Sequence, residues 1–110
     1  MSVENLNVID FASVDKNGNA VLTISDHLEW DANDSHLVIL QNKINAYLRA
    51  IEVGNFYDDY PDAKGRNVVI NIVAKHEPNS SAESFIKKTE EILQSAGYGF
   101  MFSVLKDWYF

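Results

Sequence analysis

Two β-rich runs open the chain, and a short polar turn separates them. The runs "NVIDFASV" (7–14) and "AVLTI" (20–24) are rich in the β-branched and aromatic residues that strands favour. Between them, Asn17 and Gly18 form a dipeptide that tolerates the positive φ angles of a tight hairpin turn. The pattern predicts a β-hairpin at the start of the chain.

A helical pattern follows the hairpin. Apolar residues recur at spacings of three and four, as on the buried face of an amphipathic helix. They are Leu37, Leu40, Ile44, Tyr47, Leu48 and Ile51. Gly54 ends the pattern, because glycine readily takes the left-handed conformation that closes many helices. The spacing predicts a helix over about residues 35–52.

The next two stretches differ in composition. "NFYDDYPDAKGR" (55–66) contains Asn, paired Asp, Pro and Gly, which are turn-forming residues. "NVVINIVAK" (67–75) carries apolar residues on both sides of its alternation, which is typical of a central strand. Pro78 cannot continue a strand ladder, so we expect the strand to end before it.

The last third of the chain predicts a second helix and a fourth strand. Ser80 and Glu83 have the spacing of a capping box at a helix start. The apolar stripe that follows ends at Gly97 and consists of Phe85, Thr89, Ile92, Leu93 and Ala96. "GFMFSVLK" (99–106) is the last β-rich run.

The predicted element order is β-β-α-β-α-β, in a single domain that spans residues 1–110. Two helices with one apolar stripe each can both cover one face of a sheet. We therefore expect a two-layer α+β fold with a four-stranded mixed sheet and both helices on one face. The order of the strands cannot be read from the sequence.

The chain is acidic, and its acids are unevenly distributed. Nine basic and sixteen acidic residues give a net charge of −7. Residues 1–40 contain seven acids and a single base, Lys16. Such a surface repels phosphate backbones, which argues against nucleic-acid binding, and it attracts a cation or a basic protein. Solubility is the simpler explanation of the same charge.

Several other classes are disfavoured. The absence of cysteine excludes disulfides and thiolate chemistry. The N-terminus "MSVENLNVID" lacks the basic start and apolar stretch of a signal peptide, and no apolar run is long enough to span a bilayer. We therefore expect a cytoplasmic protein with no membrane partner, and no motif indicates a cofactor.

The segment "SDHLEWDANDSHL" (25–37) concentrates the residue types that could carry chemistry. His27, Glu29 and His36 suit zinc or a similar transition metal. Their spacing matches no established motif such as His-Glu-x-x-His. The run Ser-Asp-His at the start contains the residue types of a catalytic triad, but adjacent side chains of an extended segment diverge.

Helix capping explains most of the same acids. Asp31, Asn33 or Asp34 can accept hydrogen bonds from the first N–H groups of the following helix and complement its dipole. Leu28 and Trp30 alternate with polar residues, so we expect them to point inward while their neighbours face water. Trp30 would then anchor the strand-to-helix turn against the core.

Two groups of aromatic residues offer possible contacts. Phe56, Tyr57 and Tyr60 either pack their loop onto the domain or form a binding rim. The three aromatic residues that end the chain either extend the last strand into the core or contact a partner, as in a homodimer. They are Trp108, Tyr109 and Phe110.

Four phrases of the chain together resemble a known family: "NVIDF", "LTISDHLEW", "HLVILQNKINAYLRAIEVG" and "YPDAKGRNVVINIVAK". The family consists of short acidic bacterial proteins that are known only as a domain of unknown function. The resemblance covers roughly residues 5–75 and leaves out the final "KDWYF". It implies a cytoplasmic bacterial origin and one compact domain, and it implies no activity, catalytic residue or ligand.

The sequence supports two hypotheses of different classes. The leading one is a non-enzymatic interaction module that uses its acidic N-terminal half against a basic protein, by analogy with small acidic proteins that neutralise basic toxins. Its candidate binding residues are Asp26, His27, Glu29, Asp31, Asp34 and His36. The alternative is a small metal-dependent or hydrolytic enzyme centred on His27, Glu29 and His36, whose side chains would have to converge.

Overall fold

The computed structural model describes residues 3–6 and 9–105. Its strands are β1 (Phe11–Val14), β2 (Ala20–Asp26), β3 (Val68–Ala74) and β4 (Gly99–Val104), and its long helices are α1 (Ser35–Val53) and α3 (Ser80–Ser95). The order β-β-α-β-α-β is the predicted one. The 55–66 segment, predicted as turns, contains a single helical turn α2 (Phe56–Asp59) and the 3-10 turn η1 (Pro61–Ala63).

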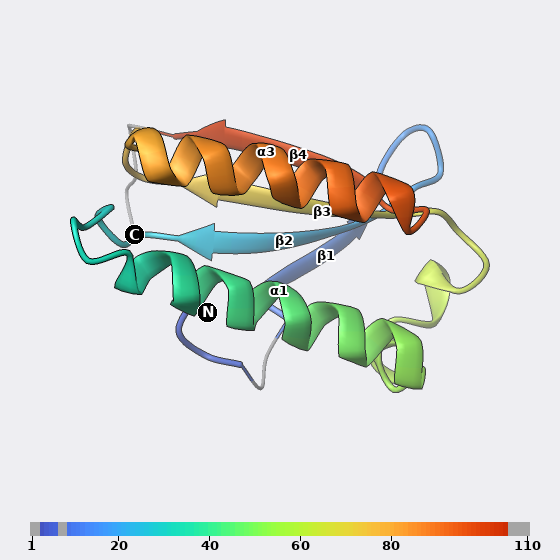
Figure 1. Ribbon diagram of the computed structural model, residues 1–110. Coiled ribbons are helices and arrows are strands. Elements are labelled where there is room, and N and C mark those ends of the chain that lie inside the picture. Colours follow the sequence, from blue (N-terminus) through green and yellow to red (C-terminus); the bar gives the residue numbers. More distant parts are fainter. Residues whose placement is uncertain (1–2, 7–8, 106–110) are drawn as a thin grey trace.

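The four strands form one sheet in the order β1-β2-β3-β4. β1 pairs antiparallel with β2, whereas β2 with β3 and β3 with β4 pair in parallel, so the sheet is mixed as predicted. Both long helices lie on the same face of the sheet (Figure 1). The carboxyl ends of β2, β3 and β4 meet at one edge of the sheet, which we call the carboxyl edge, and the 55–66 segment precedes β3 at the opposite, amino edge.

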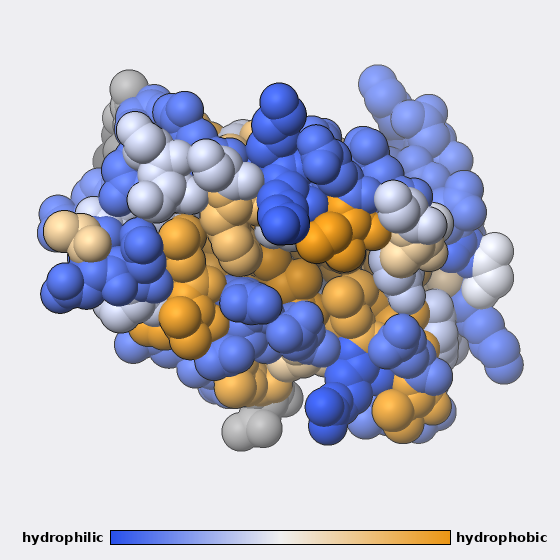
Figure 2. Space-filling model, in the orientation of Figure 1, coloured by the Kyte–Doolittle hydropathy of each residue, from blue (hydrophilic) through white to orange (hydrophobic). Residues whose placement is uncertain are grey.

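The core lies between the sheet and the two helices. Burial alternates strictly along β2 and β3, because successive side chains of a strand point to opposite faces. The side chains that meet there include Leu22, Ile24, Ile70 and Ile72 from the strands and Leu40, Ile44, Tyr47 and Leu93 from the helices. Each fully buried side chain of this size contributes about 1.5–3 kcal/mol. Figure 2 shows the apolar side chains gathered between the two helices.

The hairpin loop is longer than the predicted two-residue turn. It spans residues 15–19, and of these described loop residues only Gly18 has a positive φ, 85°. The Asp15 carboxylate accepts hydrogen bonds from the backbone N–H groups of Asn19 and Asn17, at 2.8 and 2.9 Å. These bonds, the one from Asn19 foremost, hold the pKa of Asp15 below its usual value. The side chain of Asp15 therefore stabilises the wider loop.

The ends of the long helices follow the sequence signals with one shift. Gly54, at φ 94°, closes α1 as predicted, and its N–H donates to the carbonyl of Ala50. The N-cap of α3 is Asn79, whose side chain accepts the Ala82 N–H at 2.9 Å. The helix therefore begins one residue before the predicted capping box, and Ser80 is its first helical residue.

Two further expectations concern the aromatic residues at the end of the chain and the absence of a membrane span. The aromatic residues that end the chain, Trp108, Tyr109 and Phe110, lie outside the described residues. Within residues 3–6 and 9–105, no helix has the length and apolar character needed to cross a membrane.

Candidate functional site

Asp26 and His36 meet in the interior at the carboxyl edge. Asp26 ends β2 and His36 lies in the first turn of α1, and they are 0% and 3% exposed. The Nε2 atom of His36 lies 2.7 and 2.6 Å from the two carboxylate oxygens of Asp26. Its Nδ1 atom lies 3.0 Å from the backbone carbonyl oxygen of Glu29. These contacts close the loop between β2 and α1 on itself.

Both nitrogens of the His36 ring have hydrogen-bond partners. A neutral imidazole offers one donor and one acceptor, whereas an imidazolium offers two donors. Both ring nitrogens face oxygens, so an imidazolium beside the Asp26 carboxylate satisfies every contact, and so does a neutral ring beside a protonated Asp26. The Leu28 N–H donates a further hydrogen bond to Asp26, at 3.2 Å. We interpret the pair as a buried ion pair, and its contacts fix the loop.

Trp30 ties this loop to the next one. Its ring stacks on the His36 ring, with the centroids 3.8 Å apart and the planes 17° from parallel. The indole N–H donates to the backbone carbonyl of His76, in the loop between β3 and α3, at 2.9 Å. Trp30 packs against the core as predicted, and it also links two loops of the carboxyl edge.

Among the three predicted helix caps, Asp31 is the one whose side chain caps α1. Its carboxylate accepts hydrogen bonds from the Ser35 hydroxyl and from the His36 backbone N–H. The Ser35 hydroxyl first, and the His36 N–H second, hold the pKa of Asp31 below its usual value. Asp34 stands at the N-cap position with a left-handed φ of 59°, and its side chain makes no cap hydrogen bond.

The side chains of His27, Glu29 and His36 do not converge. His27 is exposed, and its Nε2 lies 3.6 Å from a carboxylate oxygen of Glu4. Glu29 contributes its backbone carbonyl to His36, while its side chain is exposed. Among the described residues, no three His, Asp or Glu side chains are grouped so that they could hold a metal ion. The geometry that the enzyme hypothesis requires is therefore missing at these positions.

A second buried ion pair, which the sequence pattern did not predict, joins Asp10 to α1. The Lys43 Nζ lies 2.9 Å from a carboxylate oxygen of Asp10, and both side chains are 0% exposed. Lys43 also donates to the backbone carbonyl of Asn5. The other carboxylate oxygen of Asp10 accepts the Ser25 N–H at 3.0 Å. This network attaches Asn5 and Asp10 to α1 and β2.

Tyr47 completes the same network. Its hydroxyl donates to the Thr23 carbonyl at 2.7 Å and accepts the Asp10 N–H at 2.8 Å. Burial raises the pKa of Tyr47 above its usual value. Lys43 lies four residues before Tyr47 and His36 lies eleven before it, so all three share one helix face. That spacing is the signal that could have identified both buried basic residues.

The predicted acidic patch is therefore smaller than the sequence suggested. Asp26 and His36 are buried and cannot take part in an exposed patch, and Asp31 is engaged as a cap. Four of the seven acids in residues 1–40 have structural roles in ion pairs, the hairpin loop or the helix cap, namely Asp10, Asp15, Asp26 and Asp31. Much of the charge imbalance of the N-terminal half thus stabilises the fold.

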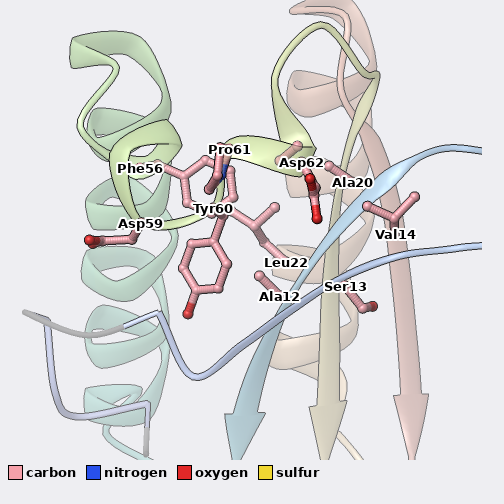
Figure 3. Close-up of a pocket in the computed structure, with 11 residues that line it drawn as sticks. Ala12, Ser13, Val14, Ala20, Leu22, Phe56, Asp59, Tyr60, Pro61 and Asp62 are labelled. Atoms are coloured by element: carbon pink, nitrogen blue, oxygen red, sulfur yellow. The ribbon is translucent and has the colours of Figure 1, made fainter.

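A cleft surrounds Tyr60 near the amino edge and consists of two adjoining hollows. The strand-side hollow, of about 220 Å³, is drawn in Figure 3 and is lined by Ala12, Ser13, Val14, Ala20, Leu22, Phe56, Asp59, Tyr60, Pro61, Asp62 and Ala63. The helix-side hollow, of about 530 Å³, is lined by Leu6, Ile9, Ala46, Tyr47, Ala50, Asn55, Phe56, Asp58, Asp59 and Tyr60. Three residues, Phe56, Asp59 and Tyr60, line both hollows.

Two aromatic residues of the 55–66 segment, Phe56 and Tyr60, line this Tyr60 cleft. Phe56 is buried, and its ring stacks on the ring of Tyr60 with the centroids 5.1 Å apart. Tyr57 meets Phe56 edge to face at 5.2 Å. The loop is therefore packed onto the domain, which was the first of the two predicted roles, and Tyr60 is also part of a concave surface.

The Tyr60 cleft is acidic without a compensating base. Asp58, Asp59 and Asp62 line it, and none of its lining residues is basic. Within the described part of the chain, no ion pair or side-chain hydrogen bond engages these three carboxylates. Arg66 lies nearby, but its guanidinium donates to the backbone carbonyls of Asp62 and Gly18, at 2.7 and 3.1 Å. The acids of this cleft, unlike most acids of the N-terminal half, remain available to a ligand.

The chain belongs to a family of unknown function, DUF6572, whose model matches residues 1–106. The match confirms the resemblance found in the sequence and extends it at both ends. Searches of the curated proteins and of the solved structures found no match.

Proposed function

We propose that this family member is a non-enzymatic module that binds a basic protein, and that the Tyr60 cleft is its binding surface. The observation that carries the proposal is the composition of the cleft: apolar walls, three carboxylates and no base among the lining residues. An interaction module is also the class that the sequence favoured, but the sequence placed its binding surface in the segment 25–37 and not at the Tyr60 cleft.

Asp58, Asp59 and Asp62 are exposed, but unlike the other exposed acids discussed above they border a concave surface. Ligand sites are typically hollows with apolar walls and a few placed polar groups. Ala12 and Pro61 supply such walls beside Asp62. A charge next to a low-dielectric wall interacts with an incoming cation more strongly than a charge surrounded by water. The exposed Glu29 and Asp34 lack such a wall among the described hollows, so they contribute mainly to the long-range field.

The net charge of −7 supports the same proposal in a second way. A strongly negative molecule attracts a basic partner over distances of about a Debye length, roughly 8–10 Å at moderate salt, and this attraction speeds association. Binding that depends on it weakens as salt rises.

The test compares two variants with the same change in charge. The cleft variant combines Asp58→Asn, Asp59→Asn and Asp62→Asn, and the edge variant combines Glu4→Gln, Glu29→Gln and Asp34→Asn. Each raises the net charge by three. The probe is a peptide rich in lysine and arginine, and its affinity is measured by isothermal titration calorimetry at two salt concentrations.

We expect the cleft variant to bind the peptide at least about tenfold more weakly, which corresponds to ~1.4 kcal/mol. The edge variant should lose only the smaller part that comes from the general field. An equal loss in both variants would reduce the proposal to non-specific attraction. A larger loss of affinity in the edge variant would indicate that the peptide binds at Glu4, Glu29 and Asp34 and not in the cleft.

The homodimer remains a separate proposal with its own support. β4 lies at the end of the sheet order, and its sequence "GFMFSV" contains no charged residue. Unprotected edge strands readily pair with another strand. We propose pairing of β4 with β4 of a second copy, which light scattering at high protein concentration tests. A dimer mass supports this contact, and a monomer mass at the highest concentration contradicts it.

A further inference from the structure

The strand-side hollow of the Tyr60 cleft has a narrow, mainly apolar interior. Its lining includes Ala12 of β1 and Pro61 of η1, with the buried side chains of Leu22 and Ala63 beneath the accessible surface. Its volume of about 220 Å³ suits one long side chain rather than a folded element. An occupant must therefore present an apolar stem to these walls.

One carboxylate is directed into this hollow. Figure 3 shows the Asp62 side chain pointing from η1 toward the strands, whereas the Asp59 side chain points away toward the α1 side. The occupant of the strand-side hollow would therefore meet the carboxylate of Asp62. Within the described residues no cation pairs with that carboxylate.

The guanidinium of Arg66 lies near Asp62, but it is hydrogen-bonded to backbone carbonyls. Arg66 donates through Nε to the Asp62 carbonyl and through Nη1 to the Gly18 carbonyl. These bonds fasten η1 to the hairpin loop, so the position of Asp62 is set before any partner arrives. A preorganised site avoids the entropy cost of ordering a loop on binding.

An aromatic ring completes the hollow. Tyr60 lines it, and Phe56 supports the Tyr60 ring from one side at 5.1 Å. Aromatic faces attract cations, and the planar guanidinium of arginine can stack on a ring while it binds a carboxylate with two parallel hydrogen bonds. The ammonium of lysine is a compact, strongly hydrated charge that offers neither geometry.

We propose that the strand-side hollow receives an arginine side chain of the basic protein partner, with its methylene stem along Ala12 and Pro61 and its guanidinium at Asp62 beside Tyr60. This inference rests on the proposed function and names the residue that the partner inserts. Arginine fits because its apolar stem can be buried while its head group remains at a polar site. Charge complementarity selects this occupant, since the Asp62 carboxylate faces the hollow and none of the lining residues is basic.

The experiment uses three tripeptides with blocked ends that differ only at the central residue: arginine, lysine or citrulline. Citrulline has nearly the shape of arginine and carries no charge. Each peptide is titrated into the full chain, and backbone amide resonances are followed by NMR. We expect the arginine peptide to shift the resonances of Ala12, Leu22, Tyr60 and Asp62, with at least about tenfold higher affinity than the citrulline peptide.

The variant Asp62→Asn should remove most of this preference for arginine over citrulline. Asp58→Asn is the matched control, because Asp58 lines only the helix-side hollow and should leave the preference intact. The side chain of Asp62 is exposed and makes no described contact, so the variant is expected to keep its fold, which the unchanged spectrum of distant residues verifies.

The outcomes separate this inference from the proposed function. Equal binding of the arginine and citrulline peptides, or an unchanged preference in Asp62→Asn, would overturn the inference even if the cleft variant still loses the basic peptide. Methylguanidine that binds as tightly as the arginine peptide would show that a small free cation is the ligand, and it would overturn a protein side chain as the occupant. Stronger binding of the lysine peptide would overturn the choice of arginine.

Discussion

Replacing His36 by leucine should destabilise the protein more than most single substitutions. The change removes the cation from a carboxylate, Asp26, that is 0% exposed and has no other charged partner among the described contacts. One hydrogen bond would remain to Asp26, from the Leu28 N–H at 3.2 Å. A buried charge left with so little compensation is costly, because water cannot reach it.

The expected size follows from the contacts that are lost. Breaking a buried ion pair on one side costs about 3–5 kcal/mol. The lost stacking on Trp30 adds roughly 0.5–1.5 kcal/mol, and part of this is recovered by the packing of the leucine. We therefore expect His36→Leu to lower the free energy of unfolding by about 4 kcal/mol, a large share of the 5–15 kcal/mol typical of a domain.

Urea denaturation followed by circular dichroism measures this loss. The midpoint should fall by more than about 1 M urea, given slopes of about 1–3 kcal/mol/M for small proteins. The control is His27→Leu, whose side chain is 45% exposed and which should change stability by no more than about 0.5 kcal/mol.

A double variant then separates charge from packing. Asp26→Leu combined with His36→Leu removes both charges, so it should be more stable than His36→Leu alone. Two results would refute the description of the pair as a buried ion pair. One is a loss below about 1 kcal/mol in His36→Leu, and the other is a double variant at least as unstable as the single one.

Three further predictions concern other parts of the fold. Lys43→Met should cost about 3–5 kcal/mol, because it leaves the Asp10 carboxylate buried, and adding Asp10→Leu should recover part of that loss in the same urea assay. Asp31 has a lowered pKa in the folded state, so it stabilises the fold above its unfolded pKa of 3.8 and loses this contribution as pH falls. Asp31→Asn should therefore weaken the pH dependence of the free energy of unfolding below about pH 4. An unchanged pH dependence in that range would contradict its role as a charged cap. Gly99→Ala should cost about 1–3 kcal/mol because the new Cβ would lie 2.9 Å from a methyl group of Val69, and Val69→Ala should relieve part of the strain in a thermal melt.

Local patterns predicted the elements well, because each depends on residues close in sequence. The stripe from Leu37 to Ile51 marks one face of α1, and the alternating residues of β2 and β3 mark the buried side of the sheet. Strand order is different, since each parallel pair joins residues that are tens of positions apart, such as Ala20 and Val68. Nothing in a local pattern specifies that pairing.

The candidate site was harder to predict for a related reason. The sequence around His36 showed which residue types were present, but their roles depend on the path of the loop. That path brings the Asp26 carboxylate to the Nε2 atom of His36 and leaves the His27 side chain exposed. A polar residue on an apolar stripe is the remaining clue, and it applies equally to Lys43. The Tyr60 cleft depends on how the segment before β3 folds back over β1 and β2, which turn-forming residues alone do not indicate.

The attachment of Lys43 has a practical consequence for handling the protein. Val3 is buried, and Asn5 and Asp10 both bind the Lys43 ammonium, so these three N-terminal residues are an integral part of the interior. Trimming this segment to obtain a shorter, better-behaved version would remove two oxygen ligands from a buried ammonium and would destabilise the remainder. Limited proteolysis near the N-terminus should therefore report global unfolding rather than the loss of a loose tail.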